Sequence, residues 1–160
     1  MKELKLDETM YVGAPGFPSE QRIKKGPVAI IECAQDIPCN PCETVCPKKA
    51  IKVGVPITNL PALDQDKCTG CGLCIPVCPG LAIFVLNYNF DERNAGLTIP
   101  YEFLPIPDRN EKIKCIDRNG KYVCNGRIVK VISPEKNSRT SIITFSFPKQ
   151  YFNVVRNFKK

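Results

Sequence analysis

The feature that most constrains this chain is the concentration of its cysteines. Ten occur among 160 residues, and eight of these lie between Cys33 and Cys78. Either disulfides or metal ligation would explain such a density. The N-terminal residues MKELKLDETM hold no apolar run typical of a secretory signal, and no apolar run reaches the roughly 20 residues that span a bilayer. We therefore expect a cytoplasmic protein without a membrane span, whose cysteines are thiolate ligands in a reducing compartment.

The second half of this segment has a specific cysteine spacing. It reads Cys68-x2-Cys71-x2-Cys74-x3-Cys78, followed by Pro79. In iron–sulfur proteins with this run, the first three cysteines bind one [4Fe–4S] cluster and the fourth binds a neighbouring cluster. Zinc is the alternative for paired cysteines, but the trailing proline and the repetition of the motif favour iron–sulfur clusters.

The cysteine-rich segment is an internal repeat with an offset of 32 residues. The offset places Cys39 on Cys71, Cys42 on Cys74, Cys46 on Cys78, and Ala50-Ile51 on Ala82-Ile83. Each half also has an apolar stretch before its first cysteine and another after its Cys-Pro pair. This order predicts a strand, a cysteine loop, a short helix and a second strand, repeated once, as a pseudo-symmetric fold for two clusters would require.

One corner of the repeat is irregular. The position that matches Cys68 is Asp36, and a cysteine stands three residues earlier, at Cys33. Three alternatives follow: Cys33 reaches the cluster through a longer loop, Asp36 binds iron through oxygen, or the corner is vacant in a three-iron cluster. We favour Cys33, because thiolate is the softer and stronger ligand for such clusters.

These observations predict two [4Fe–4S] clusters as the cofactors. Cluster A is assigned to Cys33, Cys39, Cys42 and Cys78, and cluster B to Cys68, Cys71, Cys74 and Cys46. Each set therefore combines three cysteines of one half with the last cysteine of the other half.

The chain has no histidine and a formal net charge of +7. The missing histidine excludes His-ligated zinc, Rieske centres, His-ligated haem and Ser–His or Cys–His nucleophiles. Two clusters with their thiolates contribute about −4, so a charge of about +3 remains. The sequence has no basic–aromatic interleaving, phosphate loop or carboxylate pair, so we expect neither a nucleic-acid partner nor a catalytic substrate site.

The motif CTGCGLCIPVCPG resembles the signature of bacterial 2[4Fe–4S] ferredoxin domains, and PCNPCETVCPKKAI resembles its partner half. This likeness covers residues 28–86, except at Cys33 and Asp36. With the later stretches LTIPYEFLPIP and KCIDRNGKYVCNGRIVKV, nearly the whole chain resembles small iron–sulfur subunits that accompany FAD-dependent dehydrogenases of amino acids such as proline or hydroxyproline.

The resemblance implies a non-catalytic electron-transfer subunit of an oxidoreductase. Its partners would be FAD-containing dehydrogenase subunits in a hetero-oligomer, and it would relay electrons from their flavins or between them. The alternative is a free-standing, ferredoxin-like electron carrier with docking extensions. Such carriers are commonly acidic, whereas this chain is basic.

For the fold we expect an α+β protein in three parts. Residues 1–27 are predicted to form an N-terminal arm, residues 28–90 a pseudo-symmetric dicluster ferredoxin domain, and residues 91–160 a small all-β module, either a sheet or a partly closed barrel. The last part has about five segments rich in β-branched and aromatic residues, separated by proline, asparagine and glycine.

The pair Asn119-Gly120 predicts a two-residue type I′ hairpin turn. Such a turn would pair Ile116 with Val123 and Cys115 with Cys124. The two cysteines would then be either packed, reduced thiols or a cross-strand disulfide, and the reducing compartment favours the thiols.

Overall fold

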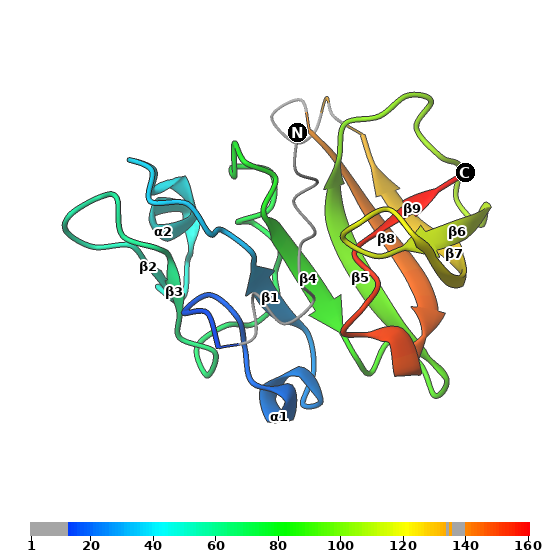
Figure 1. Cartoon of the computed structure of the whole chain (residues 1–160), viewed down its shortest axis with the longest axis horizontal. Helices are drawn as coiled ribbons and strands as arrows, with labels where there is room; N and C mark the ends of the chain where they lie inside the picture. The colour runs from blue at the N-terminus through cyan, green and yellow to red at the C-terminus, as the bar shows by residue number, and fades with distance from the viewer. Residues whose placement is uncertain (1–12, 134, 136–139) are drawn as a thin grey trace.

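The computed structural model describes residues 13–133, 135 and 140–160, so the first twelve residues of the predicted arm lie outside it. Its main element is a seven-stranded sheet with the strand order β1-β4-β5-β8-β7-β6-β9 (Figure 1). Its strands are β1 (Val28–Ile31), β4 (Ile83–Asn87), β5 (Asn94–Tyr101), β6 (Lys112–Ile116), β7 (Tyr122–Ile132), β8 (Ser141–Pro148) and β9 (Asn157–Lys159). All neighbouring strands are antiparallel.

The helices are short, and the described residues are mostly β. The helices are α1 (Glu20–Ile23), α2 (Pro41–Val45) and the 3-10 helix η2 (Lys149–Tyr151). A second sheet contains only β2 (Ile51–Lys52) and β3 (Ala62–Leu63). Figure 1 shows α2, β2 and β3 at one end of the molecule and β5 to β9 at the other. The α+β class stays a prediction.

The internal repeat is visible in how the strands pair. Ile31 of β1 lies opposite Ile83 of β4, and Leu63 of β3 lies opposite Ile51 of β2. By the offset of 32 residues, Ile31 corresponds to Leu63 and Ile83 corresponds to Ile51. The second pair therefore repeats the first, with the two strands in reversed chain order. The two halves of the cysteine-rich segment therefore share one register. Whether they form the dicluster ferredoxin fold remains a proposal.

One sheet runs through the predicted ferredoxin domain and the predicted β module. The boundary at residues 90/91 falls in the turn between β4 and β5, two strands that pair directly. In that turn Asp91 Oδ1 accepts hydrogen bonds from the backbone N–H of Arg93 at 2.8 Å and of Asn94 at 2.7 Å. Such Asx contacts are typical of tight turns and leave β5 aligned beside β4.

Strand β1 is buried on both faces. Val28 and Ile30 pack into the core of the large sheet, whereas Ala29 and Ile31 pack into a second core with the cysteine-rich segment. Because side chains alternate along a strand, an unbroken apolar run fits this position, and the sequence VAII supplies one. This strand is therefore a common wall between the two cores.

The hairpin between β6 and β7 corrects the predicted turn. The N–H of Asp117 donates to Lys121 O at 3.0 Å, and the N–H of Gly120 donates to Asp117 O at 3.1 Å. The loop thus has three residues, 118–120, and Gly120 takes a φ of 77° at its end. The two-residue type I′ turn is wrong, and a three-residue loop with glycine in the left-handed region replaces it.

The extra loop residue moves one pair and leaves another in place. Ile116 lies opposite Tyr122 instead of Val123, and an irregularity next to Cys115 then restores the pair of Cys115 with Cys124. The pairing of these two cysteines is confirmed. Both are buried, free thiols in the structure.

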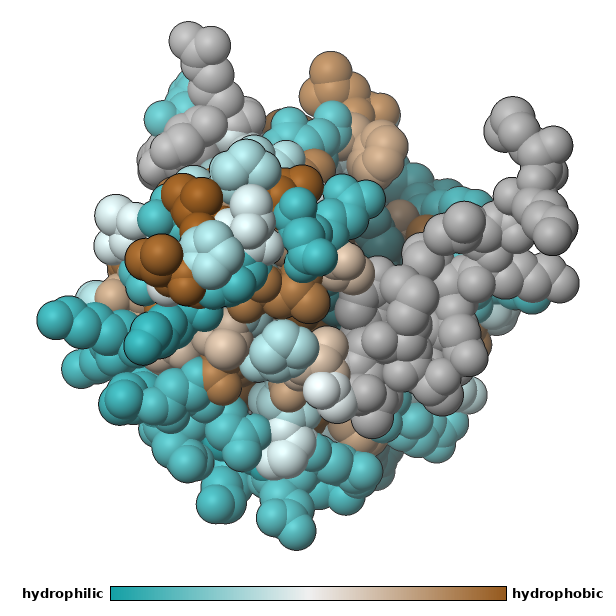
Figure 2. Space-filling view, turned by 60° about the vertical axis from the view of Figure 1, so that its left-hand side comes forward, coloured by the Kyte–Doolittle hydropathy of each residue, from teal (hydrophilic) through white to brown (hydrophobic). Residues whose placement is uncertain are grey.

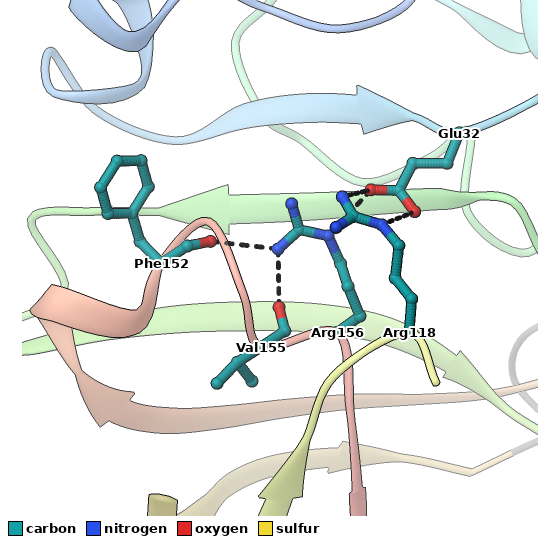
Figure 3. Close-up of polar contacts among 5 residues, drawn as sticks. All are labelled: Glu32, Arg118, Phe152, Val155 and Arg156. Atoms are coloured by element: carbon teal, nitrogen blue, oxygen red, sulfur yellow. Dashed lines mark hydrogen bonds and ion pairs between the residues drawn. The ribbon is translucent and has the colours of Figure 1, made fainter. Parts of the chain in front are cut away.

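A buried ion cluster joins β1 to the far end of the chain (Figure 3). Glu32, which follows β1, accepts hydrogen bonds from Arg118 Nε at 3.0 Å and from Arg156 Nε at 2.8 Å, and it also pairs with Arg118 Nη2. The side chains of Glu32, Arg118 and Arg156 are only 9%, 5% and 4% exposed. Nη1 of Arg156 also donates to Phe152 O at 3.1 Å and Val155 O at 2.7 Å.

The ion cluster keeps Glu32 ionised despite its burial. Burial by itself would raise the pKa of this carboxyl, but the hydrogen bond from Arg118 and the charge of Arg156 outweigh that effect and hold the pKa below its ordinary value. The contacts link positions 86 and 124 residues apart, so they join the cysteine-rich segment to both the β6–β7 loop and the segment before β9.

Replacing Glu32 by glutamine should destabilise the protein by about 3–5 kcal/mol, because two buried guanidinium groups lose their counter-charge. The repeat supplies a matched control: Asp64 occupies the equivalent position, but it is exposed and pairs with the exposed Lys67 at 2.7 Å. Asp64→Asn should cost about 1 kcal/mol or less. Anaerobic guanidinium unfolding of the three proteins measures both values. Equal losses for the two variants would contradict the structural role of the buried cluster.

Candidate metal centres

The eight cysteines predicted as ligands line two small cavities within the cysteine-rich segment. Cavity A is lined by Cys33, Cys39, Cys42 and Cys78, together with Ile31, Gln35, Ile37, Pro41, Asn59, Pro61, Pro79 and Ile83. Cavity B is lined by Cys46, Cys68, Cys71 and Cys74, together with Ala29, Pro47, Lys48, Ala50, Ile51, Thr69, Gly70, Gly72 and Leu73. The structure thus groups the cysteines in the two sets expected from the repeat. Their ligation remains a prediction.

The irregular corner of the repeat is occupied by Cys33. Cys33 lines cavity A, whereas Asp36 is exposed and does not line this cavity. Gln35 and Ile37, on either side of Asp36, do line the cavity, so the loop passes along the wall with the carboxylate outside. This geometry favours Cys33 among the three alternatives.

The crossing of the last cysteine of each half has a simple structural origin. Helix α2 carries Cys42, which lines cavity A, and Cys46 follows it and lines cavity B. The equivalent turn after Cys74 ends at Cys78, which lines cavity A. One short helical turn therefore places sulfurs in both cavities.

Two backbone amides donate to cysteine sulfur at equivalent places in the repeat. The N–H of Ala50 donates to Cys46 Sγ at 3.2 Å, and the N–H of Ala82 donates to Cys78 Sγ at 3.4 Å. The residues before these alanines, Lys49 and Leu81, have φ values of 51° and 52°. Non-glycine residues rarely adopt this left-handed conformation, which costs roughly 1–2 kcal/mol.

The sequence did not reveal these donors, although the repeat aligned Ala50 with Ala82. The only available signal was that alignment, because backbone amides leave no composition pattern. A third amide, of Ala29 in β1, donates to Cys68 Sγ at 3.4 Å. Such donors stabilise thiolate charge and tune the reduction potential of bound iron–sulfur clusters.

The loop between Cys68 and Cys74 needs glycine for two reasons. Gly70 and Gly72 have φ values of 66° and 79°. In addition, a Cβ atom on Gly70 would lie 2.7 Å from the backbone carbon of Pro27. The loop therefore wraps cavity B while its backbone packs directly on the residue before β1.

The donor set fits a cationic cluster. Burial raises the pKa of the Cys42 thiol to about 11 and that of the Cys74 thiol to about 12. Neighbouring thiols add to the effect within each cavity: Cys78 for Cys42, and Cys68 for Cys74. Such crowded thiols become thiolates when a positively charged centre shares their charge.

The cysteines surround a space and do not converge on a point. Among the residues that the structure describes, no group of three His, Cys, Asp or Glu side chains is close enough to hold a single metal ion. A structural zinc site brings four ligands within about 2.3 Å of one ion. Each cavity has four cysteines in its wall, the number of ligands that a [4Fe–4S] cluster takes.

Comparisons with known proteins find matches to the cysteine-rich segment. Residues 33–89 match the LdpA Fe-S cluster-binding domain. An uncharacterized ferredoxin of Methanocaldococcus jannaschii is 39% identical over 72 residues, which cover 42% of each chain. The ion-translocating oxidoreductase complex of Methanosarcina acetivorans has a subunit that is 47% identical over 47 residues, or 29% of this chain and 17% of that protein. The Na(+)-translocating ferredoxin:NAD(+) oxidoreductase complex of Acetobacterium woodii has a subunit that is 47% identical over 60 residues, or 32% and 17%. No solved structure gives a significant match.

The chain therefore carries a ferredoxin-type domain that binds iron–sulfur clusters. It spans less than half the length of these relatives, between 17% and 42%. In the described ranges, no helix has the length and apolar character needed to cross a membrane.

Replacing Cys33 by alanine should remove a ligand of cluster A and lower the iron content by at least one atom per chain. Asp36→Ala should leave the iron content unchanged, because this side chain lies outside cavity A. Cys124→Ala controls for the loss of a cysteine far from both cavities. Iron analysis and EPR of the reduced proteins measure the result, and two intact four-iron clusters in Cys33→Ala would rule out Cys33 as a ligand.

Proposed function

We propose that this protein holds two [4Fe–4S] clusters in a dicluster ferredoxin fold and acts in the cytoplasm as the iron–sulfur subunit of a flavin-dependent dehydrogenase complex. The observation that carries the proposal is the pair of cavities, each lined by three cysteines of one half and the last cysteine of the other half. In ferredoxins with this motif, the fourth cysteine of the run ligates the other cluster. Cysteines of both halves are arranged in that way here.

The closeness of the two cavities supports a relay. Ala29 lines cavity B and Ile31 lines cavity A, and both belong to β1. Two residues along a strand span about 7 Å. Clusters held there would be near neighbours, separated by protein that excludes water, and single electrons would pass between them. A two-electron flavin needs such one-electron acceptors.

The extent and surface of the chain support a subunit role. The residues that line the cavities all lie between Ala29 and Ile83, and beyond β1 and β4 the large sheet continues through five more strands. Figure 2 shows the end of the molecule formed by the cysteine-rich segment, where apolar side chains stand among hydrophilic ones. The exposed apolar side chains of this segment are Ile37, Val55, Ile57, Leu73 and Leu81. Exposed apolar side chains mark contacts with other proteins where they gather in a contiguous patch.

Two relatives are named as parts of oxidoreductase complexes, which also favours an assembled state. The relative named a ferredoxin favours the second candidate, a free-standing electron carrier with docking extensions. The excess of basic residues in this chain favours the first candidate, because free carriers are commonly acidic.

Anaerobically purified protein should contain about eight iron and eight sulfide per chain and no stoichiometric zinc. The ligand sets of both cavities predict this count. Iron, sulfide and zinc are measured in the same sample, and the reduced protein is examined by EPR for two spin-coupled clusters. Four iron atoms per chain, or zinc in place of iron, would contradict the two-cluster proposal.

Affinity purification of the tagged chain from its native host should recover FAD-containing polypeptides in a fixed ratio. The complex should reduce its clusters when an amino-acid substrate such as proline is added without air, because the flavin would pass electrons onward. FAD analysis and the bleaching of the visible cluster absorbance measure this. A brown monomer that binds no flavoprotein, yet reduces generic acceptors, would support the free-standing carrier instead.

A further inference from the structure

We propose that the polar face of the large sheet, beginning beside Cys71, is the docking surface for an acidic protein partner that exchanges electrons with cluster B. The identity of that partner as the flavin-containing subunit rests on the proposed function. The surface is called the basic face here and is defined by Lys112 and Lys114 of β6, Arg127 and Lys130 of β7, and Thr144 and Ser146 of β8.

These side chains share one side of the sheet because of strand alternation. Ile113, Ile128, Ile143 and Phe145 point into the core, so the residues next to them on the same strands point away from it. Lys130 is two residues after Ile128, but a register shift between them places it opposite Thr144, and the following residue, Val131, packs against the core. The cysteine-rich segment covers this outer side over β1 and β4, in a core with Ala29, Ile31, Ile83 and Val85. The same core also includes Ile142 near the start of β8 and Ile132 at the end of β7. Of the described residues, the six that define the basic face lie outside that core.

The basic face has an excess of positive charge that the fold does not need. Lys112 lies directly opposite Arg127 in the β6–β7 register. Like charges at such a position destabilise a sheet. No carboxylate of the described residues forms an ion pair with Lys112, Lys114, Arg127 or Lys130; the acidic residue nearby, Glu111, pairs with Lys160 at 3.5 Å. This repulsion is relieved when an acidic surface binds.

Two hollows follow the basic face. The first is lined by Lys112, Lys114, Arg127 and Ser146. The second lies between the sheet and the loop of cavity B, and its lining includes Cys71, Leu73, Thr98, Lys130 and Thr144. Thr144 and Ser146 are two residues apart on one strand and face the same way, so the two hollows are neighbours on one surface.

The second hollow would bring a partner beside Cys71, a ligand of cluster B under the proposed function. Cys71 is the one exposed cysteine of the ten, all of which the structure describes. Leu73, which is 51% exposed, provides an apolar contact beside it. Each transfer would move one electron, reducing cluster B by one electron and oxidising the partner's flavin by one, with no atom exchanged between the proteins. Basic side chains around the contact would orient the acidic partner and accelerate its association.

The direct test uses poly-L-glutamate as an acidic probe of the cluster-loaded protein. Wild type should bind it, with amide NMR shifts centred on β6, β7 and β8, and the affinity should fall as salt rises. Lys112→Glu/Arg127→Glu should bind at least tenfold more weakly. Lys112→Gln/Arg127→Gln removes the two opposed positive charges without placing two negative charges there. This variant should also bind poly-L-glutamate more weakly. The matched control Lys25→Glu/Lys121→Glu has the same net charge as the first variant and should stay within twofold of wild type.

Equal losses in the variant and the control would mean attraction to net charge alone and would overturn the proposal, as would no loss in either. Tighter binding of a single-stranded oligonucleotide of the same charge would point to nucleic acid and also overturn it. Residues 1–12 contain three acidic residues, so a protein without them is tested in parallel. If the removal of residues 1–12 strengthens the binding of poly-L-glutamate at least tenfold, this segment and not a partner occupies the basic face.

The second arm uses the co-purifying flavoprotein. Lys112→Glu/Arg127→Glu should retain the iron of wild type but recover at least tenfold less FAD, and its clusters should be reduced more slowly by the flavoprotein while dithionite reduces them normally. If poly-L-glutamate binds as expected and no flavoprotein is recovered even by wild type, the dehydrogenase proposal fails and the acidic-partner surface stands. If the flavoprotein binds wild type and variant equally, the docking surface fails and the dehydrogenase proposal stands.

Discussion

The contact between Glu32 and its two arginines is the interaction on which the arrangement of this molecule depends. This contact holds the end of β1, the strand shared by both cores. Glu32 also immediately precedes Cys33 in the chain. Arg118 comes from the β6–β7 loop and Arg156 from the segment before β9, so one carboxylate draws three distant parts of the chain together. A buried charge cluster of this kind adds little net stability compared with apolar packing, but it tolerates only one geometry. The irregular corner of cavity A is thereby anchored to the large sheet.

The sequence predicted the grouping of the cysteines well, because thiolate ligands must follow the shape of the group that they surround. The spacing of the cysteine run, applied to both halves of the repeat, predicted that Cys46 and Cys78 each belong with the cysteines of the other half, and both line the expected cavities. The choice between Cys33 and Asp36 depended on general ligand chemistry, and the path of the loop through Gln35 and Ile37 supports it. Backbone amides such as that of Ala50 had no signal of their own, because every residue but proline carries one.

Long-range features of the fold were beyond sequence reasoning. Nothing in the residues around Glu32 indicates that its partners lie 86 and 124 positions away. The continuity of the sheet from β4 to β5 was hidden because a polar turn looks the same inside a domain as between domains. The hairpin shows a subtler limit: Asn119-Gly120 suits a two-residue turn by propensity, yet the bulge beside Cys115 compensates for one more loop residue. Side-chain packing across the sheet decided the register there, not the turn.

The crossing of cysteines at α2 has a consequence for how the protein is made. Under the proposed ligation, each cavity is completed by a sulfur from the half that builds the other one. Maturation would then be an all-or-none event, because inserting either cluster orders a segment that the second one requires. Damage by oxygen would follow the same logic in reverse: loss of one cluster frees a ligand of its neighbour and exposes it to attack. Under this ligation, a single chain with interlocked halves would exist in cells either fully charged with iron or empty, and a half-filled species would be short-lived.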